Sequence, residues 1–239
     1  MEPESFSWLD NIFSWLEENF FSWLSENIWL VIVLVILTLL VIGASIIPLI
    51  RKGREQQQKL KEVGASIGLF MSSKDLPAPL KELRKFKLFS DGVLGFISSL
   101  MQGSKGSFDV AIFDQQLKKR DSSEFQTVIL FQSDQLNLPH FRLFPVKIYH
   151  KIASAIGYED INFDSFPKFS SQYYLKGTEE EKIRNVFKTN ILLYFENHTG
   201  WSIEGLGTRL FIYRKGNTIP PEEIREFYEQ THTIAQAFL

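Results

Sequence analysis

Residues 28–50 form an uninterrupted run without one charged side chain, and every Lys and Arg of the chain lies after it. At about 1.5 Å per residue, a helix of this length reaches roughly 34 Å, which exceeds a hydrocarbon core of about 30 Å. A core helix of a soluble protein keeps a polar face toward water, and this run offers none over about six turns. The sequence therefore predicts a single transmembrane helix over residues 28–50.

The charges on the two sides of this run predict its orientation. The chain immediately beyond it carries Arg51, Lys52 and Arg54. Positive residues close to a span stay on the cytoplasmic side, so we expect the N-terminus outside and residues 51–239 in the cytoplasm. The segment before the run has only acidic charged residues, namely Glu2, Glu4, Asp10, Glu17, Glu18 and Glu26. Without a basic region before the apolar run, cleavage as a signal peptide is not expected.

The motif Phe-Ser-Trp-Leu occurs three times before the span, at Phe6–Leu9, Phe13–Leu16 and Phe21–Leu24. A spacing of seven and then eight residues places the apolar members on one stripe of a helix, so residues 1–27 are expected to form an amphipathic helix. Trp prefers the membrane–water interface, and basic residues flank spans. The predicted membrane-interface residues are Trp8, Trp15, Trp23, Trp29, Arg51, Lys52 and Arg54.

Two interpretations of the helix over residues 1–27 stay open. It can lie on the outer leaflet and hold the span in place, although its acidic polar face is unusual for such a helix. It can instead bind a partner helix or a second copy, because the first two repeats fit a heptad. The heptad register slips at the third repeat.

The remaining chain carries all 26 basic residues and 22 of the 28 acidic ones. This small excess is not the clustered positive charge of a nucleic-acid-binding protein. The chain has no cysteine, which excludes disulfides, thiolate metal sites and a Cys nucleophile. Residues 51–62 are polar and basic and are expected to form a linker, and residues 63–239 a soluble cytoplasmic domain.

Paired strand patterns with helices between and after them predict an α+β domain with a mainly antiparallel sheet and packed helices. Two β-rich runs, Phe108–Phe113 and Phe125–Phe131, are expected to pair antiparallel. Pro139 and Pro145 interrupt Leu136–Phe144, which indicates an edge strand or an extended loop. Further expected strands are Asp160–Phe163, Gln172–Lys176 and a hairpin of Trp201–Glu204 with Thr208–Arg214; expected helices are Leu76–Phe89, Lys147–Ile156, a helix through Val186 capped by Thr178, Asn190–Asn197 and one from Pro220 to Phe238.

No motif in this domain predicts a catalytic, cofactor-binding or metal-binding residue. Gly103–Ser107 lacks the order of a phosphate-binding loop and follows a segment expected to be helical, so we interpret it as a turn. Asp109 and Asp114 flank one strand and Asp160 and Asp164 another, where carboxylates serve either acid–base chemistry or turns. The four histidines lack the spacing of metal ligands; they are His140, His150, His198 and His232.

The aromatic content of the domain has two interpretations. Most aromatic side chains are expected in the core, and the alternative is an exposed patch for a protein partner. The residues concerned are Phe141, Phe144, Phe166, Phe169, Tyr173 and Tyr174.

Several strings resemble a group of uncharacterised bacterial membrane-anchored proteins with one or two N-terminal spans and a soluble C-terminal α+β domain. The resemblance covers about residues 63–239 and excludes the Phe-Ser-Trp-Leu repeat. It implies a bacterial inner membrane, or another energised membrane, and no particular activity. The strings are Phe113-Asp114, Gln126-Thr127-Val128, Leu138-Pro139-His140-Phe141-Arg142-Leu143, Asp160-Ile161-Asn162-Phe163, Tyr174-Leu175-Lys176-Gly177, Glu204-Gly205 and Tyr213-Arg214.

The sequence favours a non-enzymatic, membrane-tethered cytoplasmic module that binds a protein partner or organises an assembly. Its expected partners are the lipid bilayer and a protein, or a second copy through the N-terminal helix. One alternative is a membrane-anchored enzyme of hydrolase type. Another is a domain that senses a lipid or a small ligand. A pocket where Asp109, Asp114 or His140 converge would favour the enzyme.

Overall fold

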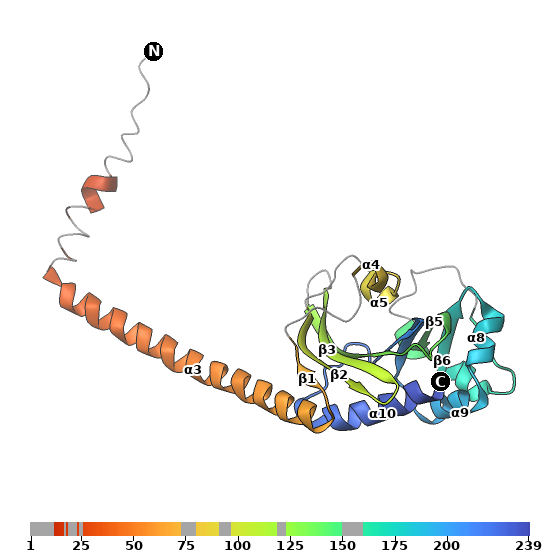
Figure 1. Ribbon diagram of the computed structural model, residues 1–239. Coiled ribbons are helices and arrows are strands. Elements are labelled where there is room, and N and C mark those ends of the chain that lie inside the picture. The colour runs from red at the N-terminus through yellow and green to blue at the C-terminus, as the bar shows by residue number, and fades with distance from the viewer. Residues whose placement is uncertain are drawn as a thin grey trace, which may run out of the picture. The chain divides into compact units, whose positions relative to one another are not determined.

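The computed structural model describes residues 12–16, 18, 23, 26–72, 80–90, 97–118, 123–149 and 160–239 (Figure 1). The chain divides into two compact units, Met1–Glu55 and Gln56–Leu239. Residues 12–16 are helical, and the rest of the predicted amphipathic helix lies largely outside the described residues.

The long helix α3, Ile28–Ser66, contains the apolar run. Within the described part of the chain it is the one helix long and apolar enough to cross a membrane, and none of its most apolar stretch is buried by protein. The two hydroxyls of the run bond within the helix: Thr38 Oγ1 donates to the Leu34 carbonyl at 3.0 Å and Ser45 Oγ to the Val41 carbonyl at 2.8 Å. Such internal satisfaction is what hydrocarbon surroundings require.

The second unit contains one eight-stranded antiparallel sheet with the order β1-β2-β3-β4-β8-β7-β5-β6. With the helices that pack on it, the sheet confirms the predicted α+β class. The strands are β1 (Phe70–Met71), β2 (Ile97–Lys105), β3 (Phe108–Lys118), β4 (Ser123–Gln132), β5 (Leu138–Pro145), β6 (Tyr173–Gly177), β7 (Ser202–Gly207) and β8 (Arg209–Tyr213).

Helices cover both faces of the sheet: α4 and α5 lie over one face, and α10 runs along the other (Figure 1). The helices of the second unit are α4 (Leu80–Leu83), α5 (Lys87–Ser90), α6 (Val146–Tyr149), α7 (Pro167–Gln172), α8 (Glu180–Val186), α9 (Thr189–Asn197), a 3₁₀ turn (Pro221–Glu223) and α10 (Ile224–Ala237). Each layer has its own apolar core, because the sheet is buried on both faces.

The predicted pairing of the two β-rich runs is confirmed: Phe113 lies opposite Val128 in the β3–β4 ladder. Side chains alternate between the faces of a strand. Ile112 accordingly joins the core on the α10 side, and Phe113 joins the core under α4 and α5. This double burial explains why the run is almost continuously apolar.

The aromatic residues in question mostly fill the core. Phe141, Phe169 and Tyr173 are buried, and the Phe141 ring packs edge-on against Phe187 with ring centroids 5.0 Å apart. They therefore do not form an exposed patch. The large apolar side chains that are exposed in the second unit belong to different elements; among the described residues they are Phe70, Phe125, Leu193 and Leu239.

The expectation of an edge position for the proline-flanked segment is wrong. The strand β5 lies inside the sheet, between β7 and β6. Its register with β7 shifts between Leu138 and Phe141, so Pro139 falls where the ladder is interrupted. A proline lacks the N–H that a regular ladder uses, and the interruption removes that requirement.

Two smaller predictions are also wrong. Residues Asp160–Phe163 are extended but form no strand; the Ile161 N–H donates to the Leu175 carbonyl at 2.8 Å, beside β6. Helix α8 begins after Glu179 without a side-chain cap, so Thr178 does not cap it.

The single helix expected over Leu76–Phe89 is instead two short helices, α4 and α5, with a turn at residues 84–86 between them; residues 76–79 lie outside the described part. Of Lys147–Ile156, residues 147–149 belong to the short helix α6, and residues 150–156 lie outside the described part. The other expected helices are present with shifted ends.

A buried carboxylate attaches α5 to the sheet. Glu204 on β7 is 2% exposed at its side chain, and its Oε2 accepts the Leu88 N–H at 3.2 Å. The Gln115 amide donates to the Leu88 carbonyl at 2.9 Å, so both backbone groups of Leu88 are bound by sheet side chains. The Tyr213 hydroxyl donates to Glu204 Oε1 at 3.1 Å, and Arg142 Nε lies 3.6 Å from the same oxygen.

Replacing Glu204 with Ala is expected to lower the unfolding free energy by about 2–4 kcal/mol, because it leaves the Leu88 N–H and Arg142 without their buried partner. Glu204→Gln keeps the hydrogen-bonding shape and should cost less. Urea titration followed by far-UV circular dichroism measures the difference. The control Glu180→Ala removes a surface partner of Arg184 and should change stability by at most about 0.5 kcal/mol. Equal effects of E204A and E180A would contradict this role.

Candidate functional site

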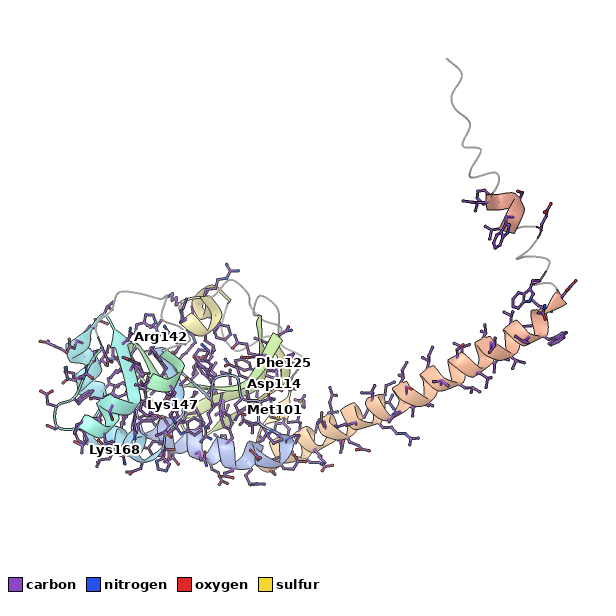
Figure 2. The ribbon with its side chains drawn as sticks, turned by 180° about the vertical axis from the view of Figure 1, so that it is seen from behind. Met101, Asp114, Phe125, Arg142, Lys147 and Lys168 are labelled. Atoms are coloured by element: carbon purple, nitrogen blue, oxygen red, sulfur yellow. The ribbon has the colours of Figure 1, made fainter. Side chains whose placement is uncertain are left out.

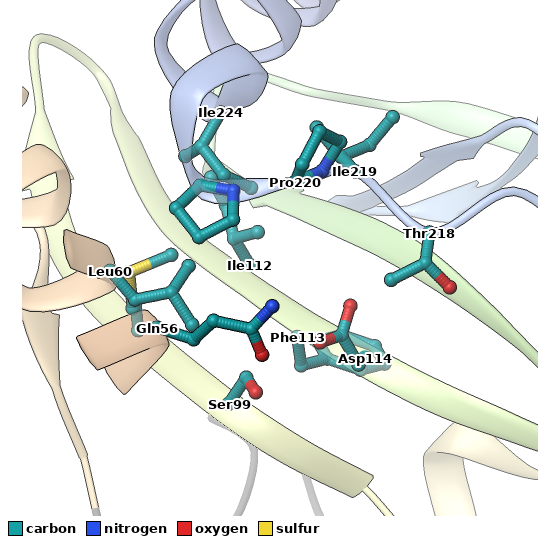
Figure 3. A pocket seen from close by; sticks show the side chains of 12 residues that line it. Gln56, Leu60, Ser99, Ile112, Phe113, Asp114, Thr218, Ile219, Pro220 and Ile224 are labelled. Atoms are coloured by element: carbon teal, nitrogen blue, oxygen red, sulfur yellow. The ribbon is translucent and has the colours of Figure 1, made fainter. Parts of the chain in front are cut away.

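A cavity of about 270 Å³ lies within the second unit, beside the first half of β2 and the middle of β3 (Figure 3). Its walls come from the end of α3, from these two strands, and from the segment that leads into α10. The lining residues are Gln56, Leu60, Ser99, Met101, Ile112, Phe113, Asp114, Thr218, Ile219, Pro220, Pro221 and Ile224. Asp114 is the one charged residue among them.

The carboxylate of Asp114 is held by its cross-strand neighbour. Thr127 lies opposite it on β4, and its hydroxyl donates to Asp114 Oδ1 at 2.6 Å. The Ile219 N–H donates to the same Thr127 hydroxyl at 2.9 Å. This hydrogen bond holds the segment that leads into α10 next to the carboxylate. Burial raises the pKa of Asp114, and hydrogen bonds from Thr127 and Ser99 oppose that rise.

Ser99 lies in a β-bulge beside this carboxylate. Two residues of β2, Ser99 and Leu100, face the single residue Phe113 of β3 where the register shifts. Ser99 has a φ of 56°, and among the described residues no other non-glycine has a positive φ. The left-handed conformation is unfavourable for a residue with a Cβ, so this backbone stores strain where the hydroxyl reaches Asp114.

The rest of the cavity is largely apolar. Leu60, Met101, Ile112 and Ile224 provide aliphatic walls, while the Gln56 amide points toward Asp114 (Figure 3). The site therefore combines a hydrophobic wall with one carboxylate and a few hydrogen-bonding groups, as small-molecule sites do.

The three residues that would have favoured an enzyme do not converge. Asp109 and Asp114 are five residues apart on β3, so their side chains point to opposite faces, and Asp109 is exposed and accepts a hydrogen bond from Ser104. His140 is on β5, with three strands between it and β3. Figure 2 places Arg142 of β5 away from Asp114 accordingly. Of the three candidates, only Asp114 lines the cavity.

Asp160 and His232, two of the other sequence candidates, have structural partners. Asp160 Oδ1 accepts the Leu175 N–H at 2.9 Å, which is loop chemistry. The turn predicted over Gly103–Ser107 is confirmed only for residues 106–107, which join β2 to β3; Gly103–Lys105 belong to β2, and the segment before them is a strand and not a helix. His232 packs against the Phe108 and Phe131 rings, and burial lowers its pKa.

No group of three His, Cys, Asp or Glu side chains suited to a metal ion occurs in the described part of the chain. His150 lies outside it. The described interface candidates Trp15, Trp23 and Trp29 are exposed, as are Arg51, Lys52 and Arg54 on α3, while Trp8 also lies outside. Their membrane role stays a prediction.

No protein-family model and no curated protein matches this chain. Among solved structures, the chain is similar to the crystal structure of the mycobacterial trehalose monomycolate transport factor A, TtfA. The match has a TM-score of 0.50 and 10% sequence identity, and it covers 77% of this chain and 93% of that one. At this identity the similarity concerns the fold.

The strain at Ser99 predicts an inverted order of two substitutions. Glycine in a strand is ordinarily less stable than alanine by about 0.5–1 kcal/mol. At this left-handed position, the unfolding free energy of Ser99→Gly should instead exceed that of Ser99→Ala by about 1 kcal/mol, because only alanine keeps the steric conflict of the Cβ. Both variants lose the hydroxyl, so the difference between them measures the conformational strain of the backbone at residue 99. Urea unfolding measures it, and a more stable alanine variant would contradict the assigned conformation.

Proposed function

We propose that this chain is a membrane-tethered, non-enzymatic module that supports an assembly or transport process by binding a protein partner. The observation that carries the proposal is the exposed apolar half of α3, which leads within six residues of Ile50 into a folded unit. A helix that is apolar on all sides is stable only when lipid or protein covers it.

The proposal includes an orientation with the folded unit in the cytoplasm of a bacterial cell. Arg51, Lys52 and Arg54 follow the apolar run, while the residues before it carry only negative charge. Short basic segments stay on the cytoplasmic side during insertion, and this bias sets the orientation of the span. Trp23 and Trp29 then lie near the outer interface, where their rings are favoured.

Two observations favour binding over catalysis. Asp114 has no second ionisable group beside it among the residues that line the cavity, so these residues provide no acid–base pair. The similar fold of a protein named as a transport factor also agrees with an accessory role in transport. We extend to this chain only that general role.

The segment before the span supplies the proposed contact with a partner or with a second copy. Substitution of its Trp side chains tests whether this segment binds lipid or protein. Both environments bury an indole ring, but only protein association depends on a matching surface.

Replacing Trp8, Trp15 and Trp23 with Ser is expected to remove a cross-linked partner or dimer from the full-length protein and to leave the span inserted. The measurement is in-cell cross-linking followed by affinity capture in mild detergent. The matched control replaces Ser7, Ser14 and Ser22 with Ala on the other side of the predicted helix and should retain the product. Equal yields from both variants would contradict partner binding through this segment.

A further inference from the structure

We propose that the Asp114 cavity binds the protonated primary amine of a small amphiphile, with the ammonium at the carboxylate and the apolar part against the aliphatic wall. This site goes beyond the proposed function, because it concerns a ligand held within Gln56–Leu239 and not a protein partner.

The charge of the site selects a cation. Asp114 is the one charged residue in the lining, and its polar neighbours Ser99 and Thr127 are neutral hydroxyls. None of the described lining residues brings a positive charge to this partly buried carboxylate, and a cation that brings its own hydrogen bonds would stabilise it. An anionic ligand would place like charges together.

The walls select an apolar body of limited size. Leu60, Met101, Ile112 and Ile224 form the aliphatic part of the lining. The volume of about 270 Å³ lies near the lower end of ligand pockets, which begin at about 300 Å³. The cavity therefore accommodates a headgroup or a small amphiphile, and not a complete lipid.

The carboxylate is pre-positioned. Thr127 bonds both Asp114 and the Ile219 N–H, and the strained bulge at Ser99 aims a second hydroxyl at the carboxylate. Strain of this kind persists where surrounding structure enforces it, and it is concentrated at ligand sites. A pre-positioned group binds a ligand without the cost of ordering itself.

The site is close in sequence to the predicted span, because Gln56 lines the cavity six residues after Ile50. An amine-bearing lipid headgroup and a free amine carry the same ammonium chemistry. The experiment below distinguishes these two sources.

Three probes with the same benzyl group test the proposal on the full-length protein in phosphatidylcholine nanodiscs: benzylammonium, benzyl alcohol and phenylacetate. Calorimetric titration, with empty discs as the blank, should rank ammonium above alcohol above carboxylate. A charge-assisted hydrogen bond predicts a preference of about tenfold or more for ammonium over alcohol. Asp114→Asn should remove that preference.

A second variant keeps the test independent of how Asp114→Asn folds. Gln56→Trp fills the mouth from an exposed position and should weaken benzylammonium about tenfold. The control Gln57→Trp is on the same helix but outside the lining, and it should bind as the unmodified chain does. Equal affinities for the three probes, no binding of any, or equal effects of Q56W and Q57W would overturn the proposal.

Discs that contain phosphatidylethanolamine identify the source of the amine. Competition that weakens benzylammonium binding supports a lipid headgroup as the ligand. Unchanged binding, together with the ranking above, supports a free amine. Neither result depends on the orientation of the span or on a protein partner, so this proposal and the proposed function can fail separately.

Discussion

The exposed apolar surface of α3 is the constraint from which the rest of the account follows. No described protein side chains bury the most apolar stretch of this helix. Water would leave this surface unfavourably hydrated, at about 25 cal/mol per Å² of apolar area. Lipid removes that cost, and it also tolerates Thr38 and Ser45, since their hydroxyls bond within the helix. The solvation of this surface therefore supports the proposed membrane tether before any residue is given a function.

Inside the folded unit, the sheet is buried on both faces, and this limits the positions at which polar side chains can lie. Asp114 with Thr127 and Gln115 with Gln126 are adjacent cross-strand pairs in the middle of the β3–β4 ladder, and they point to opposite faces of the sheet. The Gln115–Gln126 pair lies on the side of Glu204 and α5 and is used in packing. The Asp114–Thr127 pair lies next to a cavity. A polar cross-strand pair is therefore used in packing on one face of the sheet and lies beside the candidate site on the other.

Periodicity predicted the α+β class, the β3–β4 pair and the final helix, because alternation and helical spacing are local signals. The interior position of β5 was missed, since a register shift that accommodates Pro139 depends on the neighbouring strand. Asp114 was singled out as a strand-end carboxylate. Its companions Ser99 and Thr218 were not, because a bulge and a docked loop bring them together without any local motif. The sequence did not decide whether the aromatic residues are in the core or form an exposed patch, because only their tertiary contacts distinguish the two.

The central claim, a span that leaves the folded unit in the cytoplasm, is tested most directly by labelling single cysteines. The chain has no native cysteine, so Ser7→Cys and Thr199→Cys each introduce one reporter. With a membrane-impermeant maleimide on intact bacterial spheroplasts, S7C should react at once and T199C only after lysis. Reaction of T199C in intact spheroplasts, with S7C protected until lysis, would contradict the account.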